Sequence, residues 1–328
     1  MKRTAKGFTL VELLTTVGII AILVTLLMPA VNMVRKMAKE AEQKAQFNTI
    51  GMGLEAFKSD MGKYPESKWL YYNSGIRERD YQGAQRLSEA LVGWDLLGVH
   101  PDTAWKANGW NEDNSRRIYP QRPINTADPD VQKNLDERLG VYLDNPTEHA
   151  FKLCSRSNNV DDGLFYPRDF PGAYYSNNIQ NTFVLCDVFK ERRINLVDPL
   201  TSTITNVTVK AGTPILYYKA DLSSKQMSYA ASLDPTLGSR YNVSDNIMYM
   251  NLPPLSEVGK TTVTKVHKLG NDPALFYNTP QQPQNSGATY GVIDMKVPTL
   301  WPHRPDSYIL ISAGWDGLYG TSDDIFNF

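Results

Sequence analysis

The sequence predicts an α+β fold in which a long N-terminal helix, transmembrane in its first half, packs on an antiparallel β-sheet. Residues 13–31 form a run of nineteen positions without a charge, which is long enough to cross a bilayer core as a helix. A helical period of apolar residues continues through residues 34–61. Short runs rich in Val, Ile, Thr and Tyr follow only later, at residues 203–219 and 306–311.

The apolar run begins with an acid that a membrane anchor does not need. Residues 1–7 form a basic leader, and Glu12 lies just inside the edge of the apolar segment. An ionisable side chain at that depth is costly unless it has a partner, so it is interpreted as functional. A secretory signal peptide would lack this acid and would end at a small-residue cleavage site. A plain anchor would explain the length but not Glu12.

Residues 6–14, KGFTLVELL, resemble the N-terminal signature of type IV pilins and of type II secretion pseudopilins. Their shared features are a basic leader, cleavage after Gly, a Phe as the new N-terminus, and a Glu four residues further on. The resemblance implies that a prepilin peptidase cuts between Gly7 and Phe8 and methylates the Phe8 amine. It also implies a pilin-like lollipop in which Glu12 faces the N-terminal amine of a neighbouring, homologous subunit during filament assembly.

The resemblance also decides the orientation in the membrane. Cations lie on both sides of the span, at residues 2–6 and 35–39, so the positive-inside rule alone is ambiguous. Prepilin peptidase acts on the cytoplasmic side, which implies a single-pass protein of the bacterial inner membrane with a cytoplasmic N-terminus. The body is expected in the periplasm, or on the cell surface after assembly on an inner-membrane platform.

Four segments follow from these features. They are a leader at 1–7, a transmembrane and filament-core helix at 8–31, its amphipathic continuation at 32–61, and an extracytoplasmic globular domain at 62–328. The apolar stripe of the continuation is Phe47, Ile50, Leu54, Phe57 and Met61. We expect the first half of the helix to bury against other subunits and the second half against its own body. Gly62 can take the left-handed conformation that ends a helix.

The middle of the chain resembles nothing specific. A short helix is expected around residues 82–97. Residues 203–209 and 214–219 predict a hairpin joined through Ala211 and Gly212, and residues 261–268 predict another exposed strand.

The C-terminal segment 306–328 is a candidate calcium loop. Asp316, Asp323 and Asp324 fall within nine residues, among glycines that would let the backbone turn its carbonyls inward. An Asp-Gly turn whose acids merely cap backbone amides explains the same composition. The segment is similar to the calcium-binding loop of major type II pseudopilins. That resemblance implies calcium as a cofactor, the three aspartates as side-chain ligands, and Leu318 and Ser322 as carbonyl or hydroxyl donors.

Cys154 and Cys186 are the only cysteines. In an exported body they predict a disulfide more readily than a metal pair, since no CxxC exists, although geometry decides whether they bond.

Composition argues against two classes of function. The net charge is −1, and loss of Lys2, Arg3 and Lys6 lowers it by three to −4, so no nucleic-acid partner is expected. The four histidines are scattered, and neither HExxH nor GxSxG is present, so catalysis is not expected.

The predicted function is a pseudopilin-like filament subunit of a type II secretion or related system. The alternative is a minor pilin or tip protein whose enlarged middle region binds a surface, a carbohydrate or a secreted substrate. Aromatic side chains could stack on sugars there, although filling a small core is the simpler interpretation. These side chains are Trp69, Trp94, Trp105, Trp110, Tyr71, Tyr72 and Tyr81.

Overall fold

The computed structural model describes residues 7–68, 80–145, 149–172, 174–224, 239–269, 276–278 and 301–328. The contacts within the chain divide it into two units, Met1–Glu42 and Gln43–Phe328. The aromatic residues Trp69, Tyr71 and Tyr72 lie outside the described residues.

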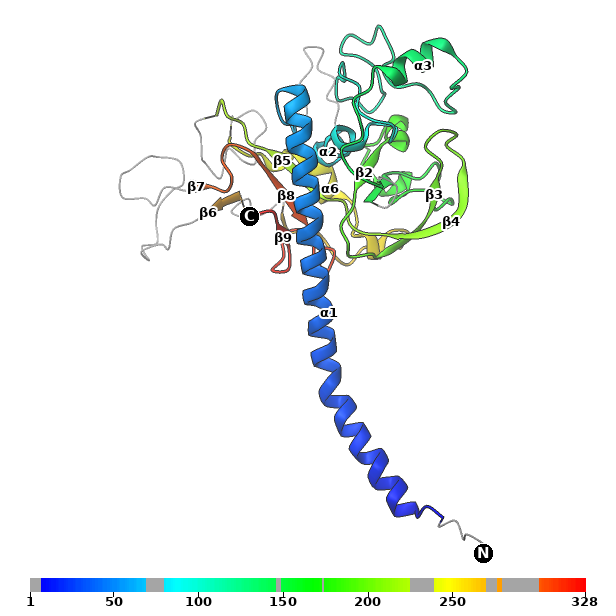
Figure 1. The fold of residues 1–328 in the computed structure, drawn as a ribbon, viewed down its shortest axis with the longest axis vertical. Helices are drawn as coiled ribbons and strands as arrows, with labels where there is room; N and C mark the ends of the chain where they lie inside the picture. Colours follow the sequence, from blue (N-terminus) through cyan, green and yellow to red (C-terminus); the bar gives the residue numbers. More distant parts are fainter. Residues whose placement is uncertain are drawn as a thin grey trace, which may run out of the picture. The chain divides into compact units, whose positions relative to one another are not determined.

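Helix α1 (Leu10–Met61) is one continuous helix of 52 residues, drawn in blue in Figure 1. It is the one helix of the described chain that is long and apolar enough to cross a membrane. Pro29 lies inside it and has no N–H to donate to the preceding turn. The helix ends as predicted, because Gly62 has a φ of +77°.

The second unit combines short helices with small antiparallel sheets (Figure 1). The α-helices are α2 (Gly83–Val92), α3 (Pro129–Asp136) and α6 (Ile247–Asn251), and the 3-10 helices are η1 (Pro167–Asp169), η2 (Asn177–Asn181), η3 (Val243–Asn246) and η4 (Leu255–Glu257). The strands are β1 (Ala150–Lys152), β2 (Phe183–Leu185), β3 (Arg192–Val197), β4 (Ile204–Ala211), β5 (Leu216–Lys219), β6 (Tyr277–Asn278), β7 (Trp301–Pro302), β8 (Tyr308–Ser312) and β9 (Ile325–Phe326). The strands pair as β1-β2, β3-β4, β5-β8-β9 and β6-β7.

The last turns of α1 form part of the core of the second unit. Phe47, Ile50 and Leu54 are buried with side chains of α2, β2, β5 and β8. The predicted class, α+β with a long N-terminal helix and antiparallel strands, is confirmed. The strands form several small sheets, whereas the sequence predicted one.

Three details of the middle region differ from the prediction. The expected hairpin does not form, because β4 pairs with β3, and β5 pairs with β8 from the C-terminal part of the chain. Residues 261–268 form no strand, since the Thr264 and Lys265 amides donate to the Glu257 carboxylate. Helix α2 stops at Val92, where Gly93 takes a φ of +88°.

The two cysteines are free and buried, so the expected disulfide is absent. The register of β1 and β2 gives the reason. Cys186 N–H donates to His149, one residue before β1, whereas Cys154 lies beyond the other end of that strand. Cys154 follows His149 by five residues, which corresponds to roughly 16 Å of extended chain. A disulfide requires Cα atoms less than about 7 Å apart.

Candidate functional site

Thr9 and Glu12 form a reciprocal cap at the start of α1. The Glu12 carboxylate accepts hydrogen bonds from the Thr9 N–H, at 2.9 Å, and from the Thr9 hydroxyl, at 2.7 Å. In return, the Glu12 N–H donates to Thr9 Oγ1 over 3.3 Å. This is a capping box, which satisfies N–H groups that a helix start otherwise leaves unpaired. Its sequence signal is the TLVE run at residues 9–12.

Glu12 therefore has a partner within its own chain. The interpretation that an acid at this position has no structural use is corrected by the capping box. Gly7 and Phe8 precede the helix in exposed, irregular backbone. The peptide bond between them is thus free of secondary structure, as a peptidase requires of its substrate.

The C-terminal candidate site is the loop between β8 and β9, which pair antiparallel. Gly314, Gly317 and Gly320 all have positive φ, between 66° and 85°. That conformation suits glycine, so the predicted tight folding of this loop is confirmed. At Gly320 the backbone approaches Leu269 so closely that an added Cβ would lie 2.2 Å from the Leu269 nitrogen.

The three aspartates of this loop accept hydrogen bonds from its own backbone and hydroxyl groups. Asp316 accepts from the Leu318 N–H at 2.8 Å, and Asp323 accepts from the Asp316 N–H at 3.0 Å. Asp324 accepts from the Gly320 N–H at 2.7 Å. These contacts are those of the capping alternative raised by the sequence.

The same loop also brings negative charges together. Burial, together with the charges of Asp323 and Asp316, raises the pKa of Asp324 to about 7, although its backbone hydrogen bonds act in the opposite direction. Glu191, which the sequence did not single out, lies beside Gly317, where an added Cβ would be 2.6 Å from Glu191 Oε1. Within the described parts of the chain, however, no three His, Cys, Asp or Glu side chains are arranged to hold a metal ion.

The other two proposed calcium donors are Ser322 and Leu318. Ser322 is exposed, and Leu318 is half-buried. The Leu318 carbonyl accepts a hydrogen bond from the Thr321 hydroxyl at 3.2 Å. A calcium ion at this carbonyl would therefore share it with a hydroxyl donor.

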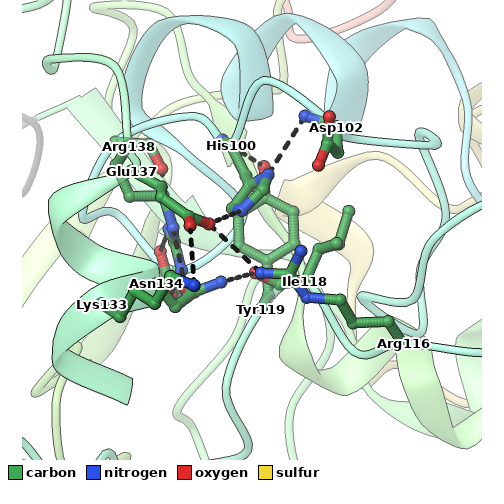
Figure 2. Close-up of polar contacts among 11 residues, drawn as sticks. His100, Asp102, Arg116, Ile118, Tyr119, Lys133, Asn134, Glu137 and Arg138 are labelled. Atoms are coloured by element: carbon green, nitrogen blue, oxygen red, sulfur yellow. Dashed lines mark hydrogen bonds and ion pairs between the residues drawn. The ribbon is translucent and has the colours of Figure 1, made fainter. Parts of the chain in front are cut away.

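A third polar cluster surrounds Glu137, just after α3 (Figure 2). Its carboxylate lies 3.2 Å from Arg116 and 3.5 Å from His100 Nε2. His100 Nδ1 accepts the Asp102 N–H, and burial lowers the pKa of the ring. Beside it, Arg138 forms a buried ion pair with Asp95 at 2.9 Å. These contacts connect the end of α3 to the preceding loops.

Known proteins match the start of the chain. A sequence profile described as the prokaryotic N-terminal methylation motif matches residues 2–28. The sequence is 35% identical over 75 residues to the type IV wide pilus major component PilA4 of Thermus thermophilus. The N-terminal part of the chain is thus similar to type IV prepilins. The aligned part covers 23% of this prepilin-like chain and 57% of the PilA4 chain. No solved structure matches this chain.

Two regions of the prepilin-like chain can now be interpreted. The motif and the long apolar helix are consistent with membrane anchoring. In the body, Tyr81 and Trp94 are buried together in a small cluster with Tyr119, and Trp105 and Trp110 are half-buried. For Tyr81 and Trp94 the simpler interpretation holds, because these rings fill a core.

Proposed function

We propose that the prepilin-like chain is cut between Gly7 and Phe8, methylated on Phe8, and assembled as a structural subunit of a type IV pilus-like filament. The observation that carries the proposal is the methylation motif at the start of α1. The apolar side chains in this part of α1 are exposed. Leu10 and Leu26, for example, are 78% and 70% exposed. A bilayer covers such a surface before assembly, and neighbouring helices cover it afterwards.

We further propose how the chain is inserted and assembled in the cell. The chain inserts into the bacterial inner membrane with its leader in the cytoplasm, where prepilin peptidase acts, and its body outside. An assembly platform then moves it into a filament of homologous subunits, of a type II secretion system or a related machine. Its role is mechanical, with no catalysis and no nucleic-acid partner.

Intact mass spectrometry of the chain from membranes of its own host tests this proposal. We expect a mass that corresponds to a chain starting at N-methylated Phe8. A matched Gly7→Leu variant should retain residues 1–7, because the residue before the cut is changed while α1 is not. An unaltered chain that keeps its leader, or that starts after Pro29, would rule out prepilin processing.

We also propose that the loop between β8 and β9 binds calcium. Its aspartates supply the oxygen donors that calcium prefers, and a cation would relieve the crowding of negative charge around Asp324. Since these carboxylates now cap amides, binding must exchange hydrogen bonds for metal contacts.

Isothermal titration with calcium and with magnesium tests the site. We expect calcium to bind with a stoichiometry of one and to raise the melting temperature, and Asp323→Asn to weaken binding. Asp136→Asn, on α3, is the matched control. Equal heats for both cations, or no heat, would reject calcium and leave the capping role.

A further inference from the structure

A small cavity lies inside the second unit, between the segment before β5, helix α6 and the C-terminal loop. The volume open to the centre of a water-sized sphere is about 10 Å³, which is close to the space that one water molecule needs. Its walls include Phe165, Leu255 and Tyr319, all at least 95% buried.

Two residues of the wall carry hydroxyl groups that have no hydrogen-bond partner among the described residues. Thr213 Oγ1 and the Tyr249 hydroxyl are both buried, and neither makes a hydrogen bond with the described protein atoms. These residues are 2% and 1% exposed. An unsatisfied buried hydroxyl is destabilising, and one water molecule in a cavity lined by both residues can serve as a shared partner.

His267 is a further polar residue of the wall. Its Nδ1 accepts the Tyr319 N–H at 3.1 Å, and its ring lies 4.8 Å from the Tyr319 ring. Burial lowers the pKa of His267 to about 4, so the ring is neutral at neutral pH. With Nδ1 acting as an acceptor, the proton of the neutral ring lies on Nε2, which gives a further potential donor in the wall.

We propose that this cavity binds one water molecule, which bridges the hydroxyls of Thr213 and Tyr249. The water thereby links Tyr249 of α6 to Thr213, which lies in the segment before β5. Tyr319 of the C-terminal loop lines the same cavity. A second cavity, of about 20 Å³, does not share this pattern, because none of its described wall residues has an unpaired buried side-chain oxygen or nitrogen.

Thermal unfolding of the full chain in detergent, with Thr213→Val, Tyr249→Phe and the double variant, tests the bridge. If the water is present, each single change removes one of its partners and lowers the melting temperature by a few degrees. The double variant should lose less than the sum of the two, because both changes break the same bridge. If the cavity is dry, removal of an unpaired hydroxyl raises the melting temperature, and the proposal fails.

Two further measurements check that the changes in melting temperature arise from a bound water. Tyr241→Phe removes a hydroxyl that donates to His303 and Arg304, away from the cavity. Its effect should add to that of Thr213→Val, and a non-additive result would remove the argument from coupling. A high-resolution crystal structure of the unaltered chain should show a density peak within hydrogen-bonding distance of both hydroxyls. An empty cavity there would overturn the proposal even if a variant failed to fold.

Discussion

The Glu12 carboxylate accepts both the N–H and the hydroxyl of Thr9, so the acid proposed to act between subunits also caps its own helix. The two roles require different properties of the side chain. Capping requires a hydrogen-bond acceptor at this position, which Gln also provides. Pairing with the amine of a neighbouring subunit requires the negative charge.

Substitutions at Thr9 and Glu12 separate these roles. Thr9→Ala removes the side-chain cap and should destabilise the start of α1 by about 1 kcal/mol, yet filaments should still form. Glu12→Gln keeps an acceptor and should abolish assembly while leaving the chain in the membrane. Filament yield on cells, normalised to the amount of membrane protein, is the measurement. Normal filaments from Glu12→Gln would show that the charge is not needed.

The sequence predicted those features of the fold that depend on local chemistry. The end of α1 at Gly62, strand β8 and the glycine turns of the C-terminal loop are each encoded within a few residues. Pairing is not encoded locally. Strand β5 pairs with β8 some ninety residues away. In residues 261–268, the amides of Thr264 and Lys265 donate to one acid, Glu257. The capping box was readable in the sequence, whereas the approach of Glu191 to Gly317 depends on tertiary structure.

Two glycines with similar backbone angles should respond differently to substitution by alanine. Gly62 and Gly320 have φ of +77° and +85°, but a Cβ at Gly62 would meet nothing within 4 Å. Gly62→Ala should therefore lower the free energy of unfolding only by the cost of placing alanine in the left-handed conformation, about 1–2 kcal/mol. Gly320→Ala should cost more, because its Cβ would collide with the Leu269 backbone. Denaturant unfolding gives both values, and equal losses would contradict a collision at Gly320.

The cysteines should behave as two protected thiols. Burial raises the pKa of Cys154 to about 12 and that of Cys186 well above its usual value, so neither is a thiolate at neutral pH. A thiol reagent should label neither residue quickly in the folded chain and both after denaturation. A reducing agent should leave the melting temperature unchanged. Labelling that requires prior reduction would instead show that a disulfide forms.

Asp187 should make the stability of the body depend on pH. It is buried, accepts N–H donors from Thr213 and Phe189, and accepts the Ser312 hydroxyl. Burial, with a smaller contribution from the nearby charge of Glu191, raises its pKa to about 8. The folded state therefore holds a proton that the unfolded state, with an aspartate pKa near 4, has released.

Stability should consequently fall as pH rises from about 4 to about 8, by up to about 1.4 kcal/mol per pH unit from this group. Asp187→Asn keeps an acceptor for the two N–H groups and cannot titrate. Its unfolding free energy should have a flatter pH profile than that of the unaltered chain, with the largest gain at pH 8. Urea unfolding at several pH values measures the difference between the two proteins, in which the contributions of other acids cancel. Parallel profiles would mean that Asp187 is already ionised in the folded state.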